Sequence, residues 1–233
     1  MSTETVLDVE SVKFGYTQDH EILHISKLLI ARGESVFLRG PSGSGKSTLL
    51  GLIGGVLKPW DGQISICGMN TTEISAGRRD KLRADHLGII FQQLNLLPYL
   101  DIIQNVTLPC RFSAARAQRA ARETGSIKKT ALKLVTELGI GSDLVSRNVG
   151  QLSIGQQQRV AVARALIGGP DLIIADEPTS ALDTENRDRF IELLDVQRKQ
   201  FNCSLLFVSH DLSLAQHFDK ALDLDDLNEA PPR

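Results

Sequence analysis

The sequence predicts an α/β fold in which strands and helices alternate along a chain of 233 residues. Three observations lead to this prediction. Short strand-like runs alternate with segments of helical composition. Several of these runs are apolar along their whole length, as in parallel strands that are buried on both faces. A glycine-rich loop also separates one strand-like run from the helix-like segment that follows it.

The first third of the chain is expected to be mostly strand. Alternating or apolar runs predict strands over 6–16, 22–31, 35–39 and 63–67. A helix is predicted over 46–57, because this segment follows the glycine-rich loop and ends before Pro59. The pair Asp61-Gly62 is typical of a hairpin turn and leads into the fourth strand.

The rest of the chain divides into a helical middle and three further strands. Apolar runs at 87–91, 172–175 and 205–208 predict buried parallel strands. Between them, residues 93–150 have helical composition, with an Ala/Arg-rich stretch at 114–122 and apolar residues at helical spacing in 127–138. We therefore expect a helical lobe that is inserted into an α/β core.

Composition narrows the class of protein. Hydrophobic residues are 42% and charged residues 23%, as in globular domains, and the net charge of −2 disfavours a broadly basic nucleic-acid binder. No apolar run approaches the ~18–20 residues of a membrane span, and the acidic start differs from a secretory signal. The three cysteines are far apart and show no metal-binding or disulfide spacing, which favours a reducing, cytosolic compartment.

The glycine-rich loop has the spacing of a phosphate-binding loop, Gly40-Pro41-Ser42-Gly43-Ser44-Gly45-Lys46-Ser47. Glycines let consecutive backbone N–H groups approach phosphate oxygens, and the following helix adds the positive end of its dipole. Lys46 is expected to reach the β- and γ-phosphates, and the Ser47 hydroxyl to bind Mg²⁺. The alternative is a flexible Ser/Gly loop before a helix.

Two carboxylates end the apolar run at 172–175. An aspartate at this point binds Mg²⁺ in many phosphate-loop enzymes, so Asp176 is the expected ligand and Glu177 the residue nearest the attacking water. Strand alternation predicts that the two side chains lie on opposite faces. The alternative is the acidic start of a helix before Pro178.

Four further segments, in order, make the chain resemble the ATP-binding subunits of ABC transporters. These segments are Phe91-Gln92 (glutamine loop), Leu152-Ser153-Ile154-Gly155-Gln156 (signature), Ser180-Ala181-Leu182-Asp183 (D-loop) and His210 (switch histidine). The resemblance covers residues 6–225. It implies a P-loop NTPase with a RecA-like core, an N-terminal antiparallel β subdomain and an inserted α-helical subdomain at 93–150, all within one ATP-binding domain over 1–233.

The resemblance also implies roles for individual residues. The expected ATP-binding residues are Tyr16, Gly40, Pro41, Ser42, Gly43, Ser44, Gly45, Lys46, Ser47 and Thr48. The expected Mg²⁺ ligands are Ser47, Gln92 and Asp176, and the expected catalytic residues are Glu177, His210, Gln92 and Lys46. Two alternatives stay open: Tyr16 as a packing residue at a strand end, and Gln93 in place of Gln92.

The signature implies a dimer. Ser153, Gly155 and Gln156 of one subunit are expected to contact the γ-phosphate held by the other, and Asp183 to couple the two sites. The alternative is a helix that Ser153 caps in a capping box with Gln156. Ile154 departs from the family's usual glycine, and its bulk predicts a working but slower site.

The partners follow from the same resemblance. A transporter needs membrane spans, so a separate permease is expected, with this subunit peripheral on the cytoplasmic face of the inner membrane. The segment 91–98 with Asn105-Val106 is most similar to the lipoprotein-releasing and macrolide-exporting subgroup. Amino-acid importers, cell-division ATPases, non-transport ABC ATPases and P-loop kinases or GTPases are the alternatives, and no nucleic-acid partner is expected.

A basic run lies within the helical middle. Residues 111–133 contain seven basic residues and one acidic residue. We expect them to form a solvated helix face, the alternative being contact with anionic lipid or an acidic permease loop.

Overall fold

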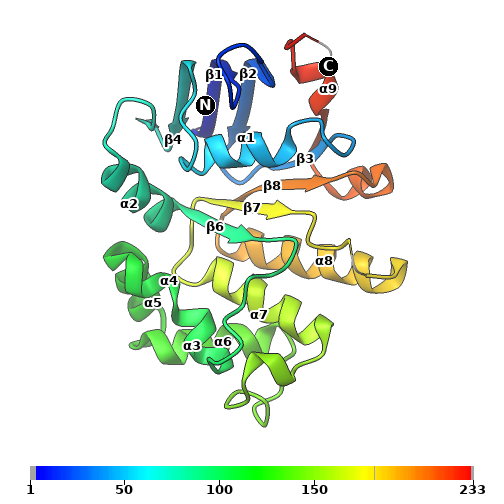
Figure 1. Cartoon of the computed structure of the whole chain (residues 1–233). Coiled ribbons are helices and arrows are strands. Elements are labelled where there is room, and N and C mark those ends of the chain that lie inside the picture. The colour runs from blue at the N-terminus through cyan, green and yellow to red at the C-terminus, as the bar shows by residue number, and fades with distance from the viewer. Residues whose placement is uncertain (1–3, 181, 232–233) are drawn as a thin grey trace.

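The structure is a computed structural model, and it describes residues 4–180 and 182–231. It stacks an antiparallel sheet, a helix, a parallel sheet and a group of helices in successive layers (Figure 1). The antiparallel sheet consists of β2 (Leu23–Ala31), β1 (Thr5–Phe14), β4 (Asp61–Ile66) and β5 (Met69–Asn70), in that order. The parallel sheet consists of β6 (Leu87–Ile90), β7 (Leu172–Asp176), β8 (Ser204–Ser209), β3 (Ser35–Arg39) and β9 (Lys220–Asp223).

The helices occupy three places in this arrangement (Figure 1). Helix α1 (Lys46–Ile53) lies between the two sheets, and α2 (Ala76–His86) leads from the antiparallel sheet into β6. Helices α7 (Ile154–Leu166) and α8 (Thr184–Gln200) cover the other side of the parallel sheet. The remaining helices are α3 (Ile102–Thr107), α4 (Pro109–Phe112), α5 (Ala114–Thr124), α6 (Ile127–Glu137) and α9 (Leu224–Leu227), with 3₁₀ turns at Val149–Gln151 and Leu212–His217.

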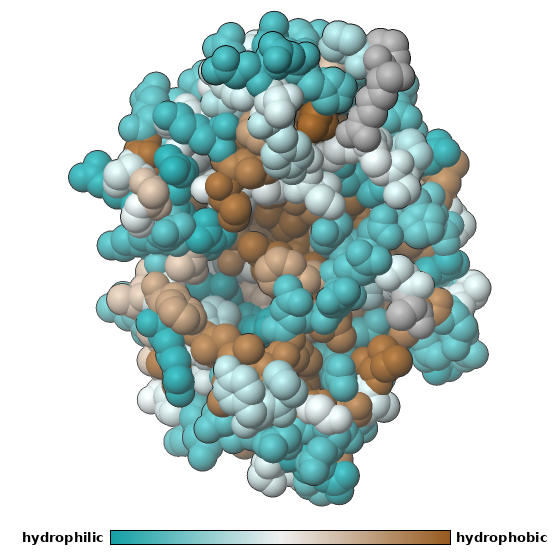
Figure 2. Space-filling model, in the orientation of Figure 1, coloured by the Kyte–Doolittle hydropathy of each residue, from teal (hydrophilic) through white to brown (hydrophobic). Residues whose placement is uncertain are grey.

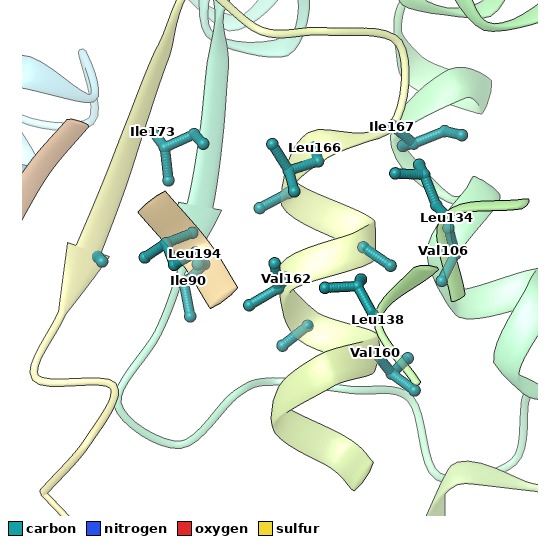
Figure 3. Packing of buried hydrophobic residues seen from close by; sticks show 14 of the residues in the cluster. Ile90, Val106, Leu134, Leu138, Val160, Val162, Leu166, Ile167, Ile173 and Leu194 are labelled. Carbon is teal, nitrogen blue, oxygen red and sulfur yellow. The ribbon is translucent and has the colours of Figure 1, made fainter. Parts of the chain in front are cut away.

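Two hydrophobic clusters hold the layers together. One cluster lies between the sheets, where Leu49 and Leu52 of α1 are buried. The other joins the parallel sheet to α7 and the helices beyond it. Figure 3 shows Val162 of α7 between Ile90 of β6 and Leu138, which directly follows α6. Because the second half of α7 packs on both sides, all its residues from Val160 to Leu166 are buried, and all but Arg164 are apolar.

The register of the parallel strands places the ends of β3, β7 and β8 side by side at one edge of the sheet. Arg39 of β3 pairs with Ser209 of β8, and Asp176 of β7 pairs with Val208 of β8. The loops that follow these three strands therefore meet at the carboxyl edge of the sheet, where α/β proteins usually bind ligands.

The predicted α/β class, with its antiparallel and parallel parts, is confirmed, but several boundaries differ. Helix α1 ends at Ile53 rather than at residue 57, because Gly54 and the left-handed Gly55 (φ +67°) follow. Strand β1 ends at Phe14 rather than at residue 16. The sequence did not predict α2, α8, β5 or β9.

The middle of the chain consists of helices and turns in residues 93–150, all of which are described. Its helices contact α7, which also contacts β6. That residues 93–150 form a subdomain of their own stays a prediction. Across residues 4–180 and 182–231, no helix combines the length and the apolar character that crossing a membrane demands.

The expectation that the basic run is a solvated face is wrong for Arg116 and Arg119. Arg116 of α5 is buried and donates hydrogen bonds to the carbonyl oxygens of Leu87, Ala165 and Ile167. Burial lowers the pKa of Arg116 to about 10. Arg119 donates to the carbonyls of Gly168 and Asp85. These arginines join α5 to the parallel sheet and to the end of α7, whereas Arg111, Arg122, Lys128 and Lys129 are exposed.

Candidate functional site

The loop over residues 40–47 joins β3 to α1 and has the backbone of a phosphate-binding loop. Gly43 and Gly45 have left-handed backbones, with φ of +86° and +102°. A Cβ at Gly45 would also lie 2.9 Å from the side chain of Leu23, so only glycine fits there. Helix α1 begins at Lys46, immediately after Gly45, and directs its N-terminal end at this loop.

Lys46 lies inside the loop that precedes it. The residue is 8% exposed, and Nζ donates hydrogen bonds to the carbonyl oxygens of Gly40 (2.7 Å) and Pro41 (2.8 Å). Nζ also lies 3.5 Å from Oε1 of Glu177. The loop thus holds a positive charge against the carboxylate at the end of the neighbouring strand.

Asp176 and Glu177 do not lie on opposite faces, so the alternation expectation is wrong. Strand β7 ends at Asp176, and Glu177 has a left-handed backbone (φ +42°) while its N–H donates to the carbonyl of Val208. The turn brings both carboxylates into one cleft of about 350 Å³, with Ser47, Thr48 and Gln92. Burial, reinforced by the charge of Glu177, raises the pKa of Asp176.

His210 completes this cluster from the end of β8. Its Nδ1 lies 3.2 Å from Oε2 of Glu177, so Glu177 stands between an ammonium group and an imidazole. The histidine side chain is itself exposed, at 62%. The glutamate is therefore oriented by two neighbours, one at the start of α1 and the other at the end of β8.

Two other predicted residues take clear positions around the cleft. Gln92 follows β6 and is among the residues that line the cleft, which Gln93 is not, and this separates the two glutamines. Tyr16 follows β1 and is 66% exposed, with its hydroxyl 3.3 Å from Oγ1 of Thr48 and its ring edge-on to Phe14. An exposed ring beside the start of α1 is free to stack on a base.

The signature and the D-loop lie on a different surface. Ser153, Ile154, Gly155 and Asp183 line a groove of about 890 Å³ between α7 and α8, and they are not among the residues of the phosphate cleft. Ala181, also part of the D-loop, lies outside the described residues. The signature and the D-loop thus lie close to each other, and both lie apart from the phosphate loop of the same chain.

Both motifs also cap helices, as the alternative interpretation expected. Ser153 caps α7 in a full capping box, in which its own N–H donates to Oε1 of Gln156 (3.0 Å). Asp183 caps α8, and its hydrogen bonds with Asn186 lower its pKa. Ile154 is the first residue of α7 and its side chain is 59% exposed, so the isoleucine does not disturb the helix start.

One neighbour of the phosphate loop was not predicted from the sequence. The acidic C-terminal segment returns to this region, where Asp225 and Asn228 share a pocket with Pro41 and Ser42. Asn228 is fixed there, because its side chain accepts from the N–H of His24 and donates to the carbonyl of Ile22. Only the pairing of distant segments reveals this contact.

A left-handed glycine loop, a lysine bound within it and two carboxylates at the adjacent strand end define a P-loop nucleotide hydrolase. The family comparison makes the class specific. The family model of the ABC transporter matches residues 23–180, and the chain belongs to that family. It is an ATP-binding subunit of the family, and an ATPase.

Relatives match over nearly the whole chain. The ABC transporter ATP-binding protein YbbA of Escherichia coli is 37% identical over 227 residues, which are 96% of each chain. The ATP-binding protein MJ0796 of Methanocaldococcus jannaschii is 36% identical over 95% of this chain and 94% of its own. A dimeric structure of MJ0796 bound to ADP and Pi superposes with a TM-score of 0.79 over 93% of both chains.

A third relative is longer. The macrolide export ATP-binding/permease protein MacB of a Shewanella species is 40% identical over 209 residues. The match covers 90% of this chain but 31% of that protein.

Proposed function

We propose that two copies of this subunit close on two ATP molecules and drive a separate permease, in an exporter of the lipoprotein-releasing or macrolide-exporting kind. One observation carries the proposal. The phosphate cleft and the signature groove lie on separate surfaces of one chain, so each needs a complement from elsewhere. The dimeric MJ0796 structure supports a second copy as that complement. The similarity to MacB, named as an ATP-binding/permease protein, supports the exporter class.

Mg²⁺ fits the chemistry of the cleft. Ser47, Gln92 and Asp176 present a hydroxyl, an amide and a carboxylate, and Mg²⁺ prefers such oxygen ligands. Burial and the charge of Glu177 raise the pKa of Asp176, so a bound divalent cation would favour the charged form of this carboxylate. The bound ion would neutralise charge on the β- and γ-phosphates.

Glu177 is the residue that activates the attacking water for hydrolysis. As a general base it takes a proton from the attacking water, while Lys46 and His210 stabilise negative charge on the γ-phosphate. Its two contacts, with Lys46 and with His210, fix the direction of its carboxylate. Tyr16 stacks on the adenine, and the backbone N–H groups of the loop bind the phosphates.

The partner's signature helix supplies the other side of the site. The first N–H groups of a helix have no intrahelical acceptor, and the N-terminal end of α7 carries a partial positive charge. Ser153 and Gly155 are exposed there, and Gln156 holds the cap. Asp183 sits in the same groove and couples the two sites across the interface.

The permease surface is the groove between α2 and the helices α4 and α5. It has a volume of about 900 Å³ and is lined by Phe91, Leu108 and Phe112, the last of which is 72% exposed. Figure 2 shows a hollow with hydrophobic side chains across the middle of this face. Phe91 lines this groove and the next residue, Gln92, lines the phosphate cleft, so adjacent residues connect the two sites. The subunit would thus sit on the cytoplasmic face of the inner membrane.

Co-purification tests this proposal. A tagged chain, expressed in its own host and recovered with solubilised membrane, should bring down one membrane-spanning protein. Phe112→Asp should lose that protein, whereas Val56→Asp, at an exposed apolar residue that does not line the groove, should keep it. Recovery of soluble or ribosomal partners alone, or an equal yield with Phe112→Asp, would contradict the assignment.

A further inference from the structure

A cluster of three possible metal ligands lies away from the ATP site. Cys67, His86 and Asp171 each offer one ligand atom, and these atoms all lie within 4.8 Å of one another. The three residues are partly buried and come from the β4–β5 turn, the end of α2 and the start of β7. Asp171 is five residues before Asp176, which places the cluster ~16 Å from the phosphate cleft along β7.

Hydrogen bonds hold the three residues close to one another. Nδ1 of His86 lies 2.7 Å from Oδ2 of Asp171, and the N–H of Asp171 donates to the carbonyl of His86. Cys67 is held by its own N–H, which donates to the carbonyl of Val6. Ligand atoms around a tetrahedral Zn²⁺ ion lie ~3.3–3.7 Å apart, so shifts of about 1 Å would bring these three together.

The backbone at Cys67 is unusual for a cysteine. Cys67 and Gly68 form a two-residue hairpin turn and both have left-handed backbones, with φ of +50° and +76°. Asn, Asp and Gly are the residues that favour the first position of such a turn. The turn therefore does not explain the cysteine, and its thiol lies within 4.8 Å of a histidine and a carboxylate from two other elements.

The surrounding charges suit a divalent cation. Arg32 lies 2.9 Å from Oδ1 of Asp171, but it also binds Glu4, with Nε 2.7 Å from Oε2. Glu4 thus offsets the charge of Arg32. A thiolate at Cys67 and the carboxylate of Asp171 then balance the two charges of the ion, with Arg32 orienting the carboxylate from outside.

The geometry points to a Zn²⁺ site formed by Cys67, His86 and Asp171, with a fourth position open to water. Thiolate and imidazole ligands select Zn²⁺ over Mg²⁺ or Ca²⁺, which prefer oxygen. The ion joins the antiparallel sheet to the parallel sheet, because Cys67 lies in a turn of the first, and His86 and Asp171 directly precede the strands β6 and β7 of the second. It therefore stabilises the contact between the two sheets without entering the ATP site.

Co²⁺ serves as the spectroscopic probe. The chelator-treated full-length chain should bind one equivalent and show a thiolate-to-cobalt charge-transfer band, which Zn²⁺ then displaces. Cys67→Ser should remove the band, and His86→Gln should weaken binding by about 100-fold. Cys110→Ser is the matched control, since Cys110 is also partly buried but is not in the cluster, and it should keep the band.

A second readout separates binding from folding. Zn²⁺ should raise the melting temperature of the wild type and of Cys110→Ser, and leave that of Cys67→Ser unchanged. ATP binding by Cys67→Ser should equal that of the wild type, which shows that the variant folds. A wild-type chain without the band, or a band that survives Cys67→Ser, would overturn the site. Co²⁺ at the oxygen ligands of the phosphate cleft gives no thiolate band, so that outcome is also distinguished.

Discussion

The phosphate cleft and the signature groove are built in opposite ways. In the cleft, Lys46 is almost fully buried and Glu177 already contacts both Lys46 and His210. In the groove, the side chain of Ile154 is mostly exposed, and a Cβ added at Gly155 would meet no atom within 4 Å. The first surface is assembled by the chain itself, and the second is left open for a partner. In the proposed dimer, one chain therefore supplies two different halves of an ATP site.

The largest expected effect on ATP turnover comes from a substitution in the phosphate cleft. Glu177→Gln removes the general base but keeps the shape and most of the hydrogen bonding of the side chain. ATP turnover should fall by about 10²–10⁴-fold while ATP stays bound. Gel filtration with ATP should then show an accumulated dimer. Turnover at the wild-type rate would show that Glu177 is not the base.

In the signature groove, a larger side chain at Gly155 should lower ATP turnover. A Cβ at Gly155 would meet no atom within 4 Å, and Gly155→Leu replaces a glycine in the first turn of α7, so folding stability should rise by up to about 0.8 kcal/mol. If the partner's γ-phosphate lies at this helix start, turnover should fall by about 100-fold. Thermal denaturation and ATPase rates measure the two effects. An unchanged rate would place the phosphate elsewhere.

A smaller effect is expected at the rim of the cleft. Tyr16→Ala removes the exposed ring and should weaken ATP binding by about tenfold, the value of one stacked base. Tyr16→Phe is the control, because it loses only the hydroxyl that lies near Thr48. Titration with a fluorescent ATP analogue measures both. Equal affinity in all three proteins would favour a packing role for Tyr16.

The smallest effect is expected from the departure in the signature. Ile154 keeps a helical backbone and an exposed side chain, so its N–H stays available. Ile154→Gly should raise the ATPase rate by no more than about two- to threefold, in line with a surface substitution. If the rate and the ATP affinity stay the same, the isoleucine is merely tolerated.

The features that could be predicted from the sequence are those that neighbouring residues determine. The phosphate loop and the cap at Ser153 follow from neighbouring residues, and the structure places them as expected. Glu177 was misplaced on the sheet because its left-handed backbone ends the strand early, while its N–H pairs with Val208 of another strand. Tertiary contacts decide such a position.

Other features needed the fold before they became visible. Arg116 belongs to a basic run, yet it is buried because three carbonyls from distant segments converge on it. Helix α2 was missed because Leu82 is its one buried residue, so it lacks apolar periodicity. The cluster at Cys67 does not match any metal-binding motif in the sequence, because its members are 19 and 85 residues apart along the chain.

Mixing two inactive variants tests most directly whether the two halves belong to different chains. Lys46→Ala disables the cleft, and Gly155→Leu disables the groove. In a mixed dimer one site carries both substitutions and the other carries neither. Equal amounts of the two variants should therefore regain about a quarter of the wild-type ATPase rate, since about half of randomly paired dimers are mixed and each has one intact site. A mixture no faster than the mean of the two variants alone would contradict the account.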